Sequence, residues 1–217
     1  MRTAILALGL VSAMAAPAAS QQMTVVAGAG YALADYREQA AFLHFQGSGP
    51  SAMLEVERGR LALRVDGSHL SLDPSGDAAA PLESFTIDQF NVRVGVRTMS
   101  LVGVEAGFFR RSAAPSRAAQ SFSAATLGVR AAYPLAPGAD VALRTAYVAG
   151  TDFSGGGSAP FGIELGLSAG YGPGSGRFRL TGDYQFQRID RRTDQSGSRL
   201  SVPIQSSVAR LALAVKF

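Results

Sequence analysis

The histidines are the first residues to consider for acid–base chemistry. His69 is followed two positions later by Ser71, and in an extended segment two such side chains point to the same side. A histidine beside a serine can take the hydroxyl proton and turn the oxygen into a nucleophile. The arrangement also needs an acid that orients the imidazole, and the sequence alone does not place one. We therefore expect no enzyme, with His69 at the rim of the fold and His44 in a loop.

Composition and spacing remove most other kinds of site. The chain has no cysteine, which excludes disulfides, cysteine zinc sites, thiol nucleophiles and iron–sulfur clusters. Two glycine-rich stretches, 28–30 and 155–157, are followed by neither a helix nor a lysine, so they are not phosphate loops. The arginines are dispersed along the chain rather than gathered in a patch, which argues against nucleic acid. We expect no metal and no cofactor.

The first twenty residues resemble a targeting signal. Arg2 precedes an almost wholly apolar run over 4–16, and small residues lead to Ser20 before the polar Gln21. A positive start, an apolar centre and a small-residue cleavage site describe a secretory signal peptide. We expect cleavage after Ser20, which leaves residues 21–217 as one domain.

The rest of the chain alternates between apolar and polar residues. From Arg177 to Gln187 one parity holds Phe178, Leu180, Tyr184 and Phe186, and the other holds charged and polar side chains. This period of two is typical of a strand with two different faces. Ten such segments follow one another, and no apolar run after residue 20 is long enough for a membrane helix. Only 17% of the residues are charged, fewer than in an average soluble domain.

The connections between these segments also follow a pattern. Short ones at 58–59, 98–100, 134–139 and 172–176 alternate with longer ones at 37–50, 73–84, 112–120, 150–160 and 191–203. Transmembrane β-barrels have short turns at the periplasmic end, longer loops at the other end and an even number of strands. The fold class is therefore expected to be all-β, an up-and-down antiparallel transmembrane barrel with ten strands, or with eight as the alternative.

The C-terminal segment resembles a known signal. Leu211, Leu213, Val215 and the terminal Phe217 share one parity. This ending is similar to the assembly signal of small Gram-negative outer-membrane β-barrel proteins, the OmpA and OmpX class. The resemblance implies location in the outer membrane as a monomer, contact with lipopolysaccharide, and passage through periplasmic chaperones and the barrel assembly machinery. A soluble lipocalin-like barrel, with its apolar face inside, is the alternative.

If the polar parity faces inward, the lumen of the barrel holds a charge network. Its predicted members are Glu55, Glu57, Arg64, Asp66, Arg93, Arg97, Glu105, Arg130, Arg144, Glu164, Arg177, Arg179, Asp183 and Arg210. Opposite charges in a confined space must pair or stay hydrated. A lumen filled by paired side chains suits a structural or surface-interaction role. The alternative is a narrow pore whose excess of arginine would favour anions.

The resemblance also leaves a rim-located enzyme as a further alternative. Some outer-membrane lipid A deacylases use a histidine, a serine and an acid on the barrel wall, which would involve His69 and Ser71. Omptin-type proteases use aspartates and a histidine at the outer rim, where Asp35, Asp73 and Asp190 are expected. The pairs Arg110–Arg111 and Arg191–Arg192 are expected near the same rim, where cations can bridge lipopolysaccharide phosphates.

Overall fold

Ten strands close into one barrel in the computed structural model, which describes residues 23–39, 42–75, 82–115, 117–173, 176–195 and 198–217. The expected signal peptide, residues 1–20, lies outside the described residues. In chain order the strands are β1 (Met23–Glu38), β2 (Leu43–Arg58), β3 (Leu61–Pro74), β4 (Phe85–Arg97), β5 (Val102–Ala114), β6 (Phe122–Ala136), β7 (Ala139–Phe153), β8 (Ser158–Tyr171), β9 (Phe178–Gln195) and β10 (Ser198–Lys216). The expectation of a ten-stranded up-and-down barrel is confirmed.

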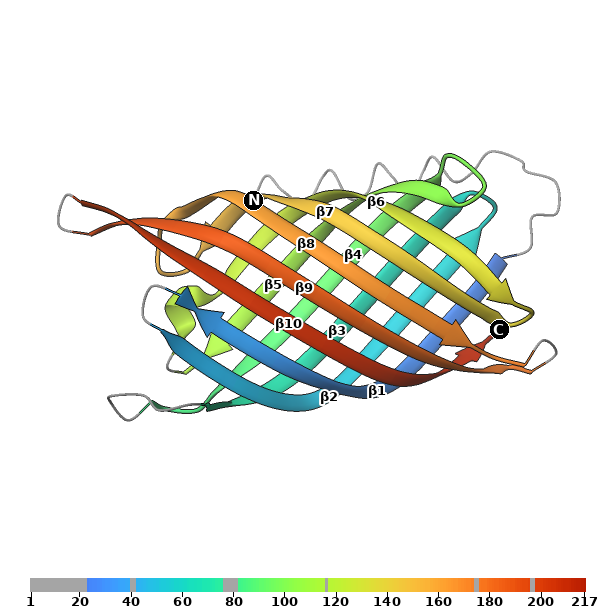
Figure 1. The fold of residues 1–217 in the computed structure, drawn as a ribbon, viewed down its shortest axis with the longest axis horizontal. Coiled ribbons are helices and arrows are strands. Elements are labelled where there is room, and N and C mark those ends of the chain that lie inside the picture. The colour runs from blue at the N-terminus through green and yellow to red at the C-terminus, as the bar shows by residue number, and fades with distance from the viewer. Residues whose placement is uncertain (1–22, 40–41, 76–81, 116, 174–175, 196–197) are drawn as a thin grey trace, which may run out of the picture.

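Each strand is antiparallel to its neighbour in sequence, and β10 returns to pair with β1 (Figure 1). The seam between β1 and β10 runs from Val26 opposite Lys216 to Glu38 opposite Ile204. Because every strand has two partners, the wall has no free edge, and its backbone polar groups are satisfied within the sheet. No helix among the described residues is long and apolar enough to cross a bilayer.

The two ends of the barrel differ in their connections. One end carries the start of β1, the end of β10 and the connections 59–60, 98–101, 137–138 and 172–177. The opposite end carries the connections 39–42, 75–84, 115–121, 154–157 and 196–197, with a short 3-10 helix, η3 (Ala118–Gln120), in the third. In transmembrane barrels the end with the chain termini and short turns faces the periplasm. We name these the periplasmic end and the outer end.

Most of the expected long loops are in fact paired strand. β1 and β2 stay paired up to Glu38 and Leu43, and β9 and β10 up to Gln195 and Ser198. The hairpin of β9 and β10 extends farthest at the outer end in Figure 1. The prediction of long loops at 37–50 and 191–203 was wrong because polar side chains on the outer surface of a strand resemble a loop in sequence.

Candidate functional site

The wall of the barrel is apolar outside and charged inside over its periplasmic half. Leu165, Leu180 and Leu211 point outward and are 45%, 50% and 59% exposed. Glu164 and Glu105, on the opposite parity, are 0% and 4% exposed. A soluble barrel would show the reverse distribution, so the lipocalin-like alternative is wrong. The protein is an outer-membrane β-barrel.

Arg64 on β3 is the first branching point of the charge network in this lumen. Its Nε donates to Glu55 at 2.6 Å, its Nη2 to Glu57 at 3.1 Å and its Nη1 to Glu105 at 2.8 Å. Because Glu55 and Glu57 are on β2 and Glu105 is on β5, one guanidinium joins three strands. These charge-assisted bonds hold the side chain of Arg64 in one orientation.

Arg144 on β7 continues the chain of contacts across the lumen. Its Nε donates to Glu105 at 2.9 Å, and its Nη1 contacts Glu164 on β8. Glu164 also accepts a hydrogen bond from Gln187 at 3.4 Å and lies 4.0 Å from the guanidinium of Arg93. The network is therefore continuous between strands that do not pair with each other, because it crosses the interior of the barrel.

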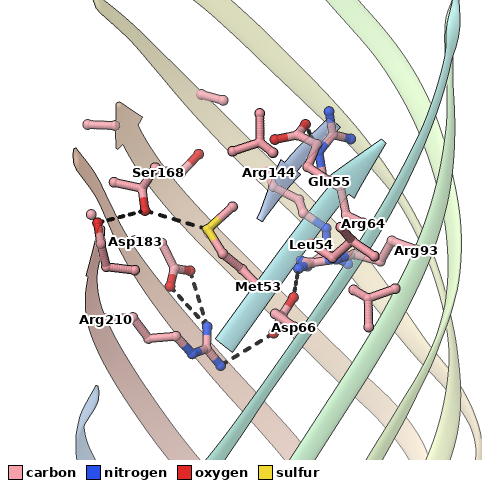
Figure 2. A pocket seen from close by; sticks show the side chains of 18 of the residues that line it. Met53, Leu54, Glu55, Arg64, Asp66, Arg93, Arg144, Ser168, Asp183 and Arg210 are labelled. Atoms are coloured by element: carbon pink, nitrogen blue, oxygen red, sulfur yellow. Dashed lines mark hydrogen bonds and ion pairs between the residues drawn. The ribbon is translucent and has the colours of Figure 1, made fainter. Parts of the chain in front are cut away.

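Figure 2 shows how the network reaches β9 and β10. Asp66 lies between the guanidinium groups of Arg93 and Arg210, with its Oδ2 3.6 Å from Arg210. Arg210 in turn donates to Asp183 at 3.0 Å and to Gln185 at 3.3 Å. The connected chain from Glu57 to Asp183 fills much of the lumen's middle, as expected for paired charges in a confined space.

Four predicted network members stand outside the connected chain of contacts. Arg179 pairs with Asp140, a residue that the sequence analysis missed although its parity matches that of Arg144. Arg97 and Arg130 point into the lumen but have no carboxylate partner among the described residues. Arg177 lies in the exposed connection before β9, so its assignment to the lumen was wrong.

The polarity of the wall reverses toward the outer end. On β3 the inward side chains change from Arg64 and Asp66 to Leu70 and Leu72, which are 1% and 0% exposed. The outward residues that flank Leu70, His69 and Ser71, are both exposed. The alternation keeps its phase, and only the polarity of each face changes. The outer half is thus built like a soluble barrel, with its polar face in water.

Buried apolar side chains from all ten strands meet inside this outer half. They form one contiguous cluster, which we call the apolar layer; it includes Tyr36, Phe45, Leu72, Phe85, Phe109, Phe122, Val148, Ala159, Ile189 and Ile204. The rings of Phe45 and Phe85 are edge to face at 4.9 Å, a favourable aromatic geometry. The prediction that the polar parity faces inward holds only in the periplasmic half, so the sequence did not predict the apolar layer.

The neighbouring arginines at the outer end point in opposite directions. Arg110 and Arg192 are exposed on the outside, whereas Arg111 and Arg191 are inward and only 3% and 4% exposed. Arg111 is 5.4 Å from the ring centroid of Phe109, and its Nη2 donates to a serine of β10 at 3.0 Å. The pairs lie toward the outer end as expected, but only one member of each faces outward, since adjacent residues of a strand face opposite sides.

Two arginines cover the apolar layer at its outer surface. The guanidinium of Arg117 is 5.2 Å from the ring centroid of Phe45, and that of Arg191 is 4.7 Å from the ring centroid of Phe153. Arg191 also donates to Gln120 at 2.7 Å. A cation placed over an aromatic face is attracted by the ring electrostatically. The apolar layer therefore has a polar cover.

The space inside the barrel lies on the periplasmic side of the apolar layer. A cavity of about 150 Å³ is lined by the charge network, including Asp66, Arg93 and Arg210. A second cavity of about 480 Å³ is lined by residues of the periplasmic turns, Arg60 and Ser100, and by Lys216 near the end of β10. We call the second cavity the periplasmic mouth.

Each histidine forms a pair with an aspartate on the outer surface of the wall. His69 Nδ1 is 2.6 Å from Asp88 Oδ1, so the structure supplies the acid that the sequence did not place. Ser71 is exposed on the same face, but no hydrogen bond joins it to His69 within the described residues. The nucleophile–base contact of a serine hydrolase is therefore missing from this arrangement.

The other pair joins His44 to Asp35, which also contacts two further side chains. Asp35 accepts hydrogen bonds from Arg37 at 2.8 Å and from Gln46 at 3.3 Å, and it lies 2.7 Å from His44 Nε2. Partial burial raises the pKa of Asp35, but the bonds from Arg37, His44 and Gln46 outweigh it and the pKa falls below its ordinary value. Within the described residues no group of side chains could hold a metal ion.

Comparisons with known proteins return similar architectures only. No protein-family model matches this chain, and no curated protein matches it. The outer-membrane protease OmpT of Escherichia coli is 8% identical, with a TM-score of 0.44 over 93% of this chain and 99% of its own. Neisserial surface protein A is 18% identical, with a TM-score of 0.38 over 90% of this chain and 97% of its own.

A further similar structure is OmpT of Vibrio cholerae, an outer membrane protein in its trimer form. It is 12% identical, with a TM-score of 0.36 over 84% of this chain, and the chain spans 64% of its length. At these values the matches carry no argument about what this chain binds or does.

Proposed function

We propose that this protein is a closed, non-conducting barrel with a structural or surface-interaction role in the outer membrane. The observation that carries the proposal is the apolar layer, to which every strand contributes. An ion that entered it would exchange most of its hydration for contact with apolar side chains, which costs several kcal/mol. Hydrophobic constrictions stop conduction for this reason. The buried Arg111 beside Phe109 already has Gln89 and Ser206 as hydrogen-bond partners. The alternative of an anion-favouring pore would require a polar path through Tyr36, Phe45 and their neighbours.

The polar outer half supports the surface-interaction part of the proposal. Its outward side chains include Asp88, Arg110, Arg188 and Arg192, beyond the last apolar outward residues of their strands. This half extends past the apolar belt. Partners outside the cell could therefore contact the wall of the barrel as well as its loops. The charges along it are of both signs, which suits hydration and polar recognition.

We also propose that the protein is not an enzyme. His69 and Asp88 are paired on an open surface, and Ser71 makes no contact with the imidazole in the described residues. A lipid-modifying reaction would be detected as fatty acid released from phospholipid or lipopolysaccharide by the purified barrel. Release that disappears in His69→Ala would contradict this part of the proposal.

Planar-bilayer conductance tests the sealed lumen. The wild-type protein should insert without producing current steps, whereas Phe109→Ala combined with Phe122→Ala should open a measurable leak. The matched control replaces two outward residues of the same two strands, Phe108→Ala with Leu127→Ala, and should stay closed. Steady conductance by the wild-type barrel would overturn the proposal in favour of a pore.

A further inference from the structure

The periplasmic mouth contains more positive charge than its carboxylates neutralise. Six cationic and four anionic side chains line it. Glu55 and Glu57 are bound by Arg64, Glu105 by Arg64 and Arg144, and Asp140 by Arg179. The cationic side chains of this cavity without a carboxylate partner in the described part of the chain are Arg60, Arg97, Arg130 and Lys216.

Two of these cations are positioned on either side of a glycine. Arg97 on β4 lies opposite Gly103 on β5, and Gly103 lies opposite Arg130 on β6. Adjacent strands are about 4.8 Å apart, so the two arginines start about 10 Å from each other on the inner wall. A Cβ at Gly103 would lie 2.8 Å from the carbonyl oxygen of Val96, so no side chain fits between them. The wall therefore forms a trough with a guanidinium on each side.

The surroundings of Arg130 make an anion favourable there. Arg130 lies directly opposite Arg144 in the register, and Arg144 already uses Glu105 and Glu164. Arg64 repels the half-buried guanidinium of Arg130, and nearby Glu55, Glu57 and Glu105 attract it without forming an ion pair with it in the described residues. A bound anion would reduce that repulsion and would accept hydrogen bonds from both edges of the trough.

We propose that the periplasmic mouth is a blind binding site for a small solute that carries phosphate groups. Guanidinium groups bind phosphate oxygens through paired, charge-assisted hydrogen bonds, and more than one arginine favours a multiply charged group. The volume of about 480 Å³ is within the range of small-molecule sites. Entry from the periplasm alone rests on the sealed lumen proposed above, whereas binding itself does not.

Calorimetric titration with inorganic pyrophosphate tests the site. The wild-type barrel in lipid nanodiscs at low salt should bind it saturably, and added sodium chloride should weaken binding. Arg97→Gln with Arg130→Gln should weaken it at least tenfold without changing folding, because neither arginine holds a carboxylate. The control Arg110→Gln with Arg192→Gln removes two exposed outer cations and should bind as the wild type does.

A single introduced thiol gives a second measurement. The chain has no cysteine, so Ala132→Cys places one reactive group in the periplasmic mouth. An anionic thiol reagent should react there several times faster than a cationic one, and pyrophosphate should slow it. Equal rates for the two reagents, or pyrophosphate binding unchanged in the Arg97/Arg130 variant, would overturn the proposal. A barrel that conducts but still binds pyrophosphate would overturn the sealed lumen and support the anion site.

Discussion

Phe217 and Val25 form the last backbone pair of the barrel's closing seam. The amide of Phe217 donates to the carbonyl oxygen of Val25 at 2.9 Å, and the amide of Val25 donates to Phe217 at 3.5 Å. The terminal residue therefore completes the pairing of β10 with β1 at the periplasmic end. Its side chain is 73% exposed on the apolar outer face, together with Leu211 and Leu213.

The first prediction concerns this terminal residue. Deleting Phe217, or changing it to aspartate, should lower the folded fraction in cells while leaving export intact. The deletion removes the last seam pair, and both changes remove the side chain that we propose the assembly machinery reads. Heat-modifiable migration on a gel measures the folded fraction. Met23→Ser, at the same end and also exposed, is the control; normal folding of the Phe217 variants would contradict the proposal.

A second prediction follows from the orientation of β8. Leu165 points outward near the middle of the apolar belt, whereas Ser168 points inward opposite Asp183. Leu165→Arg should destabilise the barrel by roughly 2 to 4 kcal/mol, the cost of an arginine at the bilayer midplane. Ser168→Arg should cost less because the lumen is polar there and the carboxylate of Asp183, already bound to Arg210, can accept a second guanidinium. Denaturant unfolding in lipid vesicles compares the two, and a larger loss for Ser168→Arg would contradict the assigned facing.

The third prediction tests the charge network at its most buried carboxylate. Glu164→Gln removes the charge beside Arg144 and Arg93, and it should cost about 3 kcal/mol, since breaking a buried ion pair leaves an unpaired charge. Glu57→Gln should cost less than about 1 kcal/mol, because Glu57 is 36% exposed and its partner Arg64 keeps two other carboxylates. Equal losses of unfolding free energy in the two variants would show that burial of the carboxylate does not determine how much its loss destabilises the barrel.

The apolar replacement of the same pair gives a complementary result. Glu164→Leu combined with Arg144→Leu should be less destabilising than Glu164→Leu alone, because no buried charge is then left without its main partner. Additive losses in the double variant would mean that the two side chains do not interact in the folded barrel.

The fourth prediction is a pH dependence that depends on Asp35. Because its pKa is lower in the folded barrel, Asp35 stabilises the fold fully above the unfolded-state pKa of about 3.9, and this contribution is lost as pH falls through the lower folded pKa. Asp35→Asn should remove that acid-dependent part and leave the rest of the profile. Thermal unfolding between neutral pH and pH about 2 measures it; an unchanged profile in Asp35→Asn would disprove the assignment.

Much of the periplasmic half could be predicted from sequence. The alternation around Leu180 and Leu211 gives a strand with one apolar face whatever surrounds it, because side chains of a strand point alternately to two sides. Low charge and the ending at Phe217 then indicate which face meets lipid. The carboxylates and arginines of the lumen, such as Glu105 and Arg144, follow from the same parity, but their partners do not, since they are on strands that do not pair with each other.

The outer half was decided by the tertiary structure. The segment around Leu70 and Leu72 alternates as regularly as the one around Arg64, and its parity alone does not say which face is inside. Only closure of the barrel brings Leu72 and Phe45 together with Ile189, on a strand far away in the chain, into one apolar layer. The sequence by itself determined that there are strands with two faces and a lipid-facing belt. Closure decided where polarity reverses, because a side chain's surroundings depend on which other strands share its level in the barrel.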